Sequence, residues 1–367
     1  MKITFFGLSI TSSWGNGHAT TFRALCRALW QRGHDIEFFE KDQEWYAGNR
    51  DMPEPPFCRT HVVSDWTEAL PNIRRSLKNS DVVVVGSFLP DGIRVVDEVL
   101  SSPVPVKIFY DIDTPITIAA LRRGDCKYLR HDQVAGFDLY LSFTGGPLLR
   151  EIEARFGSPR ALPFYCSFDP EKYKYTPNQR FRCDLGYMGT YASNRQGKIE
   201  KFLCEPARRL RDRSFLVAGP LYPEDLSWPP NVRTIVHLEP NLHALFYSSA
   251  RFTLNVTRSE MVEAGYSPSV RLFEAAACAA AIISDQWPGL ELFFEPGEEI
   301  LLPRSAEDVI AYLTQIPEEQ ARAIGRAAQV RVLAEHTAEH RAAQFEGYVE
   351  AALLPAEVTR GSATVRS

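Results

Sequence analysis

The sequence predicts an α/β protein built from two Rossmann-like, doubly wound domains that face each other across a cleft. Short apolar runs alternate with helix-patterned segments almost throughout the chain. Uninterrupted apolar strands joined by helices indicate a parallel sheet covered on both faces. The chain has 367 residues, which is more than one ordinary core accommodates, so two domains are expected. Ligands of such sheets bind beyond the carboxyl ends of the strands, which makes the cleft the natural place for a site.

The first domain is placed at residues 1–165. It opens with the strand candidate "KITFFGL" and the helix candidate "TTFRALCRALWQRG", for which Gly33 is the stop signal. Further strands are predicted at "DIEFFE", "DVVVVGSF", "VKIFYDI" and "FDLYLSF". The segment that follows, "RALPFYCSFDPEKYKYTPNQRF", is rich in proline and aromatic residues and lacks periodicity, which is typical of a linker.

The second domain is placed at residues 166–335 because a second α/β series begins there. Its strands are predicted at "CDLGYMGTY", "SFLVAGP", "VRTIVHL", "RFTLNVT" and "AIISD", with a helix near 195–212. The sequence from 305 onward is helical in pattern. The last residues, 356–367, are polar and are expected to form a flexible tail.

Composition narrows the possible functions. The chain is 45% apolar and 24% charged, as expected of a soluble globular protein, and its net charge of −5 gives no electrostatic reason to expect nucleic acid as a partner. No apolar run is long enough to span a membrane. The seven cysteines include no C-x-x-C pair, which favours reduced thiols and a cytoplasmic location.

The first strand-to-helix loop, "TSSWGNGHATT", is a candidate acceptor loop. Gly15 and Gly17 permit a close approach of backbone to ligand, and the helix behind them offers free N–H groups to an anion or a hydroxyl-rich ligand. A third glycine is missing, so the dinucleotide-binding fingerprint is not met. His18, at the start of the helix, is a candidate general base, and the alternative is a helix-capping or exposed histidine.

Two aspartates follow a predicted strand in "FYDIDTP". Asp111 and Asp113 would emerge at the same edge of the sheet as His18, where one of them would orient the histidine and stabilise its charge. The alternative, a turn-forming aspartate before Thr-Pro, is expected to hold for at least one of the two. D-x-D is also a metal motif of some sugar-transferring enzymes, but those have a single-domain architecture, so no metal is expected.

The corresponding loop of the second domain is "GYMGTYASNRQGK". Gly189 gives flexibility after the strand, and Arg195 and Lys198 place two cations near the start of the next helix. Cations at this end oppose the helix dipole, which is understandable if they meet a bound polyanion such as pyrophosphate. The alternative is a pair of solvated surface cations.

A later stretch, "GYSPSVRLFEAAACAAAIISDQWPG", places an arginine and a glutamate on a small, apolar helix. Ser267 is the expected N-cap, Pro268 the first helical residue, and Arg271 and Glu274 share one face. Arg258 follows a predicted buried strand and should emerge at the carboxyl edge. The helix is either a surface element with an i,i+3 ion pair or a nucleotide-binding element. In the second case the phosphates sit at its start, with Glu274 about 9 Å further on at the ribose.

These residues resemble a known family. "RLFEAAACAAAIISD" and "FFEPGEEILLP" look like the C-terminal domain of GT-B glycosyltransferases, and the similarity is greatest to the CgeB-type (spore maturation) and glycosyltransferase family 1-like proteins. It covers roughly 184–315, with "NVTR" and "YSPSVRLFEAA", and extends more weakly to "GHATTFRAL" and "YDIDTP". The resemblance implies that a final helix, placed at 336–355, crosses back to the first domain.

The resemblance also implies roles for individual residues. It makes Glu274 the ligand of the donor ribose, and Arg195 and Lys198 the pair that grips the donor phosphates. His18, with Asp111 or Asp113, resembles the histidine and acid of the acceptor-side domain.

The sequence departs from the family at one position. Many retaining members carry a second glutamate eight residues before the ribose ligand, where this chain has Tyr266. A His–Asp pair is also found in inverting members, so the stereochemistry stays open.

The expected function is therefore transfer of a sugar from a nucleotide-sugar donor to an acceptor hydroxyl in the cleft, without a metal. No cofactor is expected besides the donor, a UDP- or GDP-linked sugar that acts as substrate, and the acceptor is a glycan or small molecule. Two alternatives are an epimerase of nucleotide sugars with the same fold and a non-catalytic protein that binds nucleotides or glycans. The predicted donor-binding residues are Gly189, Arg195, Lys198, Arg258, Tyr266, Ser267, Ser269, Arg271 and Glu274.

Overall fold

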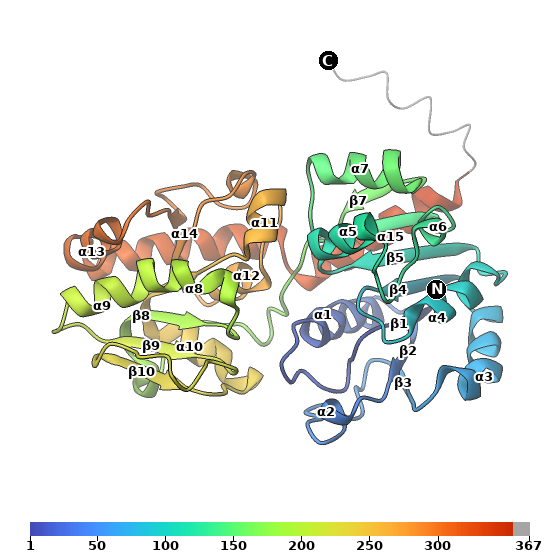
Figure 1. Cartoon of the computed structure of the whole chain (residues 1–367), viewed down its shortest axis with the longest axis horizontal. Helices are drawn as coiled ribbons and strands as arrows, with labels where there is room; N and C mark the ends of the chain where they lie inside the picture. Colours follow the sequence, from blue (N-terminus) through green and yellow to red (C-terminus); the bar gives the residue numbers. More distant parts are fainter. Residues whose placement is uncertain (355–367) are drawn as a thin grey trace, which may run out of the picture. The chain divides into compact units, whose positions relative to one another are not determined.

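The computed structural model describes residues 1–354 and divides the chain into two compact units. The first unit contains Met1–Tyr165 together with the helix α15 (Ala338–Leu353), and the second contains Cys166–Thr337. Figure 1 follows the chain through both. The tail predicted at 356–367 lies outside the described residues.

The first unit is built on a seven-stranded, all-parallel sheet with the order β3-β2-β1-β4-β5-β6-β7. In the register of its central strands, Phe5 of β1 lies opposite Phe38 of β2 and Val84 of β4. The order reverses between β1 and β4, which is the switch point of a doubly wound sheet. The strands are β1 (Lys2–Phe6), β2 (Asp35–Lys41), β3 (Arg59–Val63), β4 (Val82–Gly86), β5 (Val106–Asp111), β6 (Leu139–Ser142) and β7 (Ala161–Pro163).

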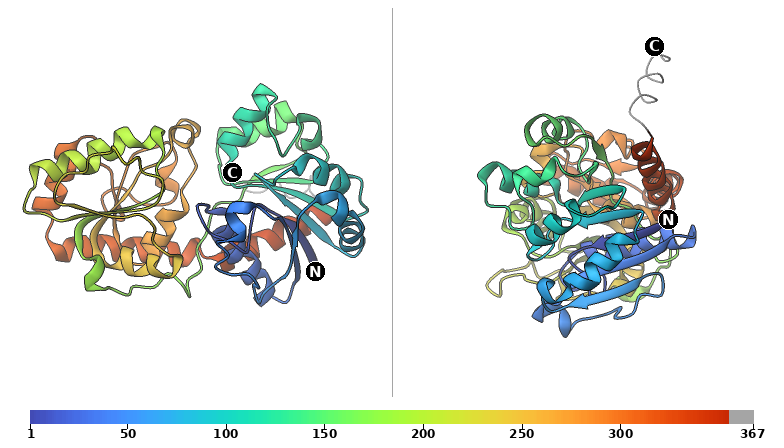
Figure 2. Two further views of the ribbon diagram at one scale, coloured as in Figure 1. Left: turned by 60° about the horizontal axis from the view of Figure 1, so that its bottom comes forward. Right: turned by 90° about the vertical axis from the view of Figure 1, so that its right-hand side faces the viewer.

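Helices lie on both sides of this sheet (Figure 2). The helix α15 packs along α1 and also contacts β5. Gly33, with a φ of +88°, follows the end of α1 and confirms the predicted stop. The helices are α1 (His18–Gln31), α2 (Glu44–Ala47), α3 (Trp66–Lys78), α4 (Gly92–Leu100), α5 (Thr114–Arg123), α6 (His131–Val134), α7 (Pro147–Phe156) and α15.

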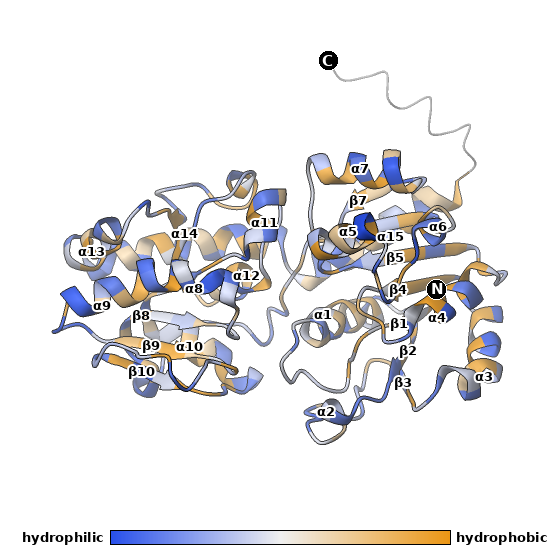
Figure 3. Cartoon of the chain, in the orientation of Figure 1, coloured by the Kyte–Doolittle hydropathy of each residue, from blue (hydrophilic) through white to orange (hydrophobic). Residues whose placement is uncertain are grey.

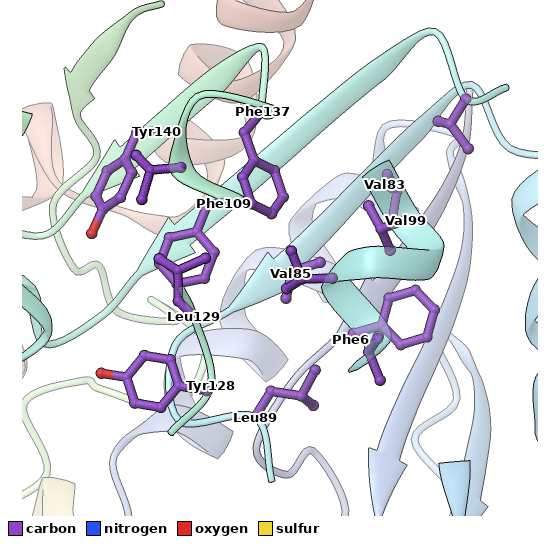
Figure 4. Packing of buried hydrophobic residues seen from close by; sticks show 14 of the residues in the cluster. Phe6, Val83, Val85, Leu89, Val99, Phe109, Tyr128, Leu129, Phe137 and Tyr140 are labelled. Carbon is purple, nitrogen blue, oxygen red and sulfur yellow. The ribbon is translucent and has the colours of Figure 1, made fainter. Parts of the chain in front are cut away.

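The core of the first unit forms because the apolar strands bury both faces against amphipathic helices. Figure 4 shows one side of it, where Val83 and Val85 of β4 meet Val99 of α4, and Phe109 of β5 lies near Phe137. The helix α7 carries both apolar and polar residues, as the two colours in Figure 3 show. This division is what amphipathic covering helices require.

The second unit repeats the plan with a six-stranded parallel sheet in the order β10-β9-β8-β11-β12-β13. Its switch point lies between β8 and β11. The strands are β8 (Cys183–Met188), β9 (Phe215–Ala218), β10 (Val232–Ile235), β11 (Ala250–Asn255), β12 (Ala281–Ser284) and β13 (Ile300–Leu301).

The helix predicted near 195–212 runs from Ser193 to Arg209 as α8 (Ser193–Ile199), a π-helical turn (Glu200–Cys204) and α9 (Glu205–Arg209). The helix α12 packs against α14, which also lies on β12. The remaining helices are α10 (His243–Ser249), α11 (Ser259–Ala264), α12 (Val270–Ala277), α13 (Ala306–Gln315) and α14 (Glu318–Glu335). Short 3₁₀ turns occur at Gln179–Phe181, Pro240–Leu242 and Leu290–Leu292.

The predicted fold class, two doubly wound parallel sheets, is confirmed. The structure adds β3, β7 and β13, which the sequence analysis missed. The predicted start of α12 was wrong: the N-cap is Ser269 and the helix begins at Val270, while Ser267 and Pro268 precede it. No disulfide joins any of the seven cysteines, all of which lie in the described part of the chain. None of the helices within residues 1–354 is long and apolar enough to cross a membrane.

Candidate functional site

The first unit brings His18 and Asp113 together at the carboxyl edge of its sheet. His18 is the first residue of α1, and its Nε2 lies 3.1 Å from Oδ2 of Asp113, the N-cap residue of α5. The imidazole is buried, with its ring edge-on to Phe88 at 5.7 Å between centroids. Nδ1 is also buried and has no hydrogen-bond partner among the described residues. The pair has the geometry of a histidine oriented by a carboxylate.

Asp111 has a different environment from Asp113. Its carboxyl is fully buried and accepts hydrogen bonds from the hydroxyls of Tyr140 and Thr117, the latter at 2.7 Å. Burial raises the pKa of Asp111 to about 6, although the hydroxyl of Tyr140 acts in the opposite direction. Through these bonds the buried carboxyl of Asp111 joins β5, β6 and α5, whereas Asp113 is the aspartate that meets His18.

The loop before α1 is held at its base by the carboxylate of Asp51. Asp51 binds Arg23 of α1 through two hydrogen bonds of 2.7 and 2.9 Å, and also accepts from the backbone N–H of Ser13. These bonds lower the pKa of Asp51 to about 2 against the opposing effect of burial. Gly15 and Gly17 lie in this loop with nothing within 4 Å of an added Cβ. The loop is therefore fixed at its base and open around the two glycines.

In the second unit Arg271 spans the switch point of the sheet. It projects from the first turn of α12, and its guanidinium donates to the carbonyl oxygen of Met188, at the end of β8, and to that of Val256, just after β11, at 3.4 and 3.1 Å. The guanidinium also lies over the ring of Tyr187, 6.0 Å from its centroid. One of the two alternatives for this helix was a surface ion pair between Arg271 and Glu274. That pair is not formed, because Nη1 and Nη2 of Arg271 both donate to backbone carbonyls.

Arg195 and Arg258 lie near Arg271. Arg195, in the first turn of α8, is only 5% exposed and donates to the carbonyl of Thr190. Its pKa is lowered to about 10, first by burial and then by the positive charges of Arg271 and Arg258. Among the described residues, no ion pair joins any of the three to a carboxylate. Three uncompensated cations at one edge of a sheet form the chemical environment that a polyanion needs.

Lys198 has a carboxylate partner. Its Nζ lies 2.5 Å from Oδ2 of Asp285, the residue after β12, and Asp285 in turn accepts from the backbone N–H and hydroxyl of Thr257. Asp285 is 3% exposed. The ion pair places Lys198 at the same edge as the arginines but neutralises much of its charge.

The residues that lead into α12 are held by hydrogen bonds to Pro288 and Asn255. Tyr266 has a φ of +50°, and its backbone N–H donates to the carbonyl of Pro288 at 2.6 Å. The hydroxyl of Ser269 donates to Oδ1 of Asn255 at 2.9 Å, and no side chain caps the N-terminus of the helix. Ser267 is buried. The first N–H groups of α12 therefore lie at the end of β11 without a side-chain acceptor.

Glu274 lies one turn further along α12 and is only 4% exposed. Burial raises its pKa to about 7, opposed by a hydrogen bond from the hydroxyl of Tyr173 and by the charge of Arg271. Tyr173 belongs to the segment predicted as a linker, and its hydroxyl also lies 3.4 Å from Nδ1 of His243. The structure thus places Glu274 on the predicted element but covers its carboxyl.

Two residues of this edge were missed by the sequence analysis. Asn255 is the last residue of β11 and holds Ser269, and Asp285 directly follows the neighbouring β12 and holds Lys198. The reasoning that selected Arg258, that a polar residue directly after a buried strand emerges at the carboxyl edge, would also have found Asp285. Within residues 1–354, no group of three or more histidine, cysteine, aspartate or glutamate side chains is arranged to hold a metal ion.

Comparison with known proteins shows that the fold of the chain is similar to that of glycosyltransferases. Residues 195–347 match the model of a family described as glycosyl transferase-like. The whole chain is similar to sucrose-phosphate synthase from Thermosynechococcus elongatus, with a TM-score of 0.67, 15% identity and coverage of 95% of this chain and 98% of that one. No curated protein matches the chain significantly.

Two further structures share the fold and contain a sugar nucleotide or its parts. HepE from Anabaena, in complex with UDP and glucose, aligns with a TM-score of 0.68 and 12% identity over 96% of this chain and all of that one. An alpha-glucosyltransferase in complex with UDP-glucose and DNA containing an abasic site aligns with a TM-score of 0.70 and 12% identity over 95% and 99%. The chain therefore has the GT-B fold of glycosyltransferases.

Proposed function

We propose that the protein is a glycosyltransferase that uses a nucleotide-sugar donor. The observation that carries this proposal is the group Arg195, Arg258 and Arg271 at the switch point of the second sheet, where no carboxylate within residues 1–354 forms an ion pair with them. The fold and the match over 195–347 support a transferase. The narrower likeness to CgeB-type enzymes stays a prediction.

In the proposed donor site the diphosphate lies between the three arginines and the first N–H groups of α12. Guanidinium groups and helix N–H groups would stabilise the charge that develops on the departing diphosphate, the task that a metal ion performs in other enzymes. The reaction proposed here is accordingly metal-independent. Arg271 would act without reorganisation because the carbonyls of Met188 and Val256 already fix its position.

Glu274 is proposed to bind the ribose hydroxyls. Its carboxyl accepts a hydrogen bond from the hydroxyl of Tyr173. A ribose hydroxyl would take the place of the Tyr173 hydroxyl and donate a hydrogen bond of the same kind. The nucleotide is proposed to be UDP, since HepE and the alpha-glucosyltransferase contain UDP or UDP-glucose; GDP is the competing candidate.

The first unit is proposed to hold the acceptor, a glycan or small molecule with a nucleophilic hydroxyl. His18 would remove the proton of that hydroxyl, and Asp113 would stabilise the imidazolium that forms. A proton on Nε2 facing Asp113 leaves the lone pair on Nδ1, which is the buried nitrogen without a partner among the described residues. Acceptor binding must therefore uncover Nδ1 or turn the ring.

The donor site is tested by binding of UDP and GDP, measured by titration calorimetry on wild type and Arg258→Gln. Arg258 is exposed, so its replacement should leave the fold intact. We expect wild type to bind one nucleotide and Arg258→Gln to bind it about tenfold more weakly, the effect of losing one charge-assisted hydrogen bond.

The matched control is Arg211→Gln, which removes an exposed arginine that precedes β9 and so lies toward the opposite edge of the sheet. It should bind the nucleotide like wild type. Absence of binding by wild type, or equal weakening by both substitutions, would refute the donor site. Release of UDP from UDP-glucose in the presence of candidate acceptors then tests transfer itself.

A further inference from the structure

A polar cavity lies at the amino edge of the second unit's sheet. Its volume is about 770 Å³, and it is lined by the first residues of β8, β11 and β12 together with the segment 175–179 and the start of α14. The donor site proposed above lies at the carboxyl ends of the same strands. Because β8 has six residues, the two edges are about 20 Å apart.

The walls of this cavity carry an excess of positive charge. Four arginines, Arg182, Arg213, Arg251 and Arg322, face two carboxylates, Asp184 and Glu318, which leaves a net charge of +2. Arg322 is neutralised by Glu318 at 2.5 Å. The other three arginines have a single carboxylate among the lining residues, that of Asp184.

Asp184 compensates these arginines only in part. Its Oδ1 lies 3.3 Å from Nη1 of Arg213 and 3.9 Å from Nη1 of Arg251, while Oδ2 accepts from the backbone N–H and the hydroxyl of Ser214. The Nε of Arg213 lies 3.8 Å from Oδ2 of Asp212, and the Nε of Arg251 has no hydrogen-bond partner within residues 1–354. Three arginines against the carboxylates of Asp184 and Asp212 still leave a net positive charge for an anion.

Arg251 is oriented by backbone carbonyls, and its only carboxylate neighbour among residues 1–354 is Asp184, which it shares with Arg213. Its guanidinium donates to the carbonyls of Leu313, at 2.9 Å, and of Ile316, at the end of α13. Carbonyl oxygens fix the orientation of a guanidinium but supply no negative charge. A fixed arginine next to two further arginines suits a tetrahedral dianion, which accepts paired N–H bonds from guanidinium groups.

We propose that this cavity binds a small phosphorylated metabolite, with its phosphate monoester held by Arg182, Arg213 and Arg251. The cavity is of the size that encloses a small organic ligand, and its remaining walls include the side-chain amide of Asn178. This site is distinct from the donor site because it uses other residues at the opposite edge of the sheet.

The test is a titration of the full-length protein with inorganic phosphate and with glycerol 3-phosphate at constant ionic strength. We expect saturable binding by wild type, with glycerol 3-phosphate bound at least as tightly as phosphate. The double variant Arg182→Gln/Arg213→Gln should bind both about tenfold or more weakly. Arg258→Gln, which alters the donor edge, should retain the wild-type affinity for both probes.

A second variant acts in the opposite direction. Glu318→Gln removes an exposed carboxylate from the cavity wall and frees Arg322, so binding should tighten about two- to fivefold. Absence of saturable binding by wild type would overturn the proposal, as would an unchanged affinity in both the double variant and Glu318→Gln. Loss of binding in Arg258→Gln alone would assign the phosphate to the donor site and also overturn it.

Discussion

The position of Arg271 depends on the absence of a side chain at residue 189. A Cβ added to Gly189 would lie 2.6 Å from Nη1 of Arg271 and 2.7 Å from the hydroxyl oxygen of Tyr187. Both distances are well below the van der Waals contact of carbon with nitrogen or oxygen. In Gly189→Ala the guanidinium must therefore move away from the carbonyl of Met188, to which it now donates.

The expected loss of stability follows from this overlap. Overpacking a buried site costs about 1–3 kcal/mol, and Arg271 is a long side chain that can give way, which places the effect near the lower value. For a unit of this size, each kcal/mol lowers the midpoint of thermal unfolding by about 2–4 °C. The free energy of nucleotide binding should be reduced by more than the free energy of unfolding, because the displaced guanidinium is a proposed phosphate ligand.

Gly197→Ala is the matched control. Gly197 lies inside α8, no atom lies within 4 Å of an added Cβ, and alanine favours a helix by about 0.5–1 kcal/mol over glycine. This variant should be slightly more stable than wild type and bind UDP equally well. The reasoning would be refuted if Gly189→Ala matched wild type in both the unfolding midpoint and the dissociation constant for UDP measured by calorimetry.

Three further predictions concern the first unit. His18→Ala should lower the turnover of sugar transfer about 10²–10⁴-fold and Asp113→Asn by a smaller factor, with nucleotide affinity unchanged in the same calorimetric assay; a loss of affinity would contradict the assignment to the acceptor side. Burial raises the pKa of Asp111 to about 6, so the folded state holds a proton that the unfolded state releases near pH 4, and stability should fall as pH rises between these values. Asp111→Asn should abolish this slope in urea unfolding, and a persisting slope would show another group to be its cause. The hydrogen bond from Arg32 lowers the pKa of Glu346 to about 2, so its contribution is present above about pH 4.5 and is lost toward pH 2; Glu346→Gln should speed hydrogen exchange of α15 at neutral pH, and unchanged exchange would contradict this.

The fold was predictable to the extent that buried parallel strands have a simple pattern. The run "VVVVG" of β4 is buried at every residue, and such continuous apolar segments identify the centre of the sheet. The strand β3, "RTHVV", lies at the edge of the sheet and is partly exposed, so its mixed composition gave no signal. The strands β7 and β13 have three and two residues and form only because a neighbouring strand supplies the hydrogen bonds.

The candidate site was predictable as an edge of the sheet, but not as a set of contacts. The rule that polar residues after buried strands emerge together identified Asp113 near His18. The partner of Lys198 is Asp285, 87 residues away, and local spacing does not predict an interaction at that separation. The hydroxyl that covers Glu274 belongs to Tyr173, in a segment whose composition predicts a linker.

The identity of an arginine's partner distinguishes the candidate ligands from ordinary surface cations. On the outer helices of the second unit, Arg208 pairs with Glu200 and Arg209 with Glu307, and each pair is neutral. Arg195 and Arg271 are instead bound by backbone carbonyls. A carbonyl orients the guanidinium but leaves its charge, and burial of uncompensated charge is unfavourable unless an anion completes the site.

The same criterion applies to both edges of the second sheet. Arg251, at the amino edge, is bound by two carbonyls in the way that Arg271 is bound at the carboxyl edge. One carbonyl-bound arginine at each edge of the sheet, each with further arginines beside it, supports the proposal of a separate anion site at each edge. Two variants separate these sites. Arg258→Gln should weaken the binding of UDP and leave the binding of phosphate unchanged, and Arg182→Gln/Arg213→Gln should do the reverse.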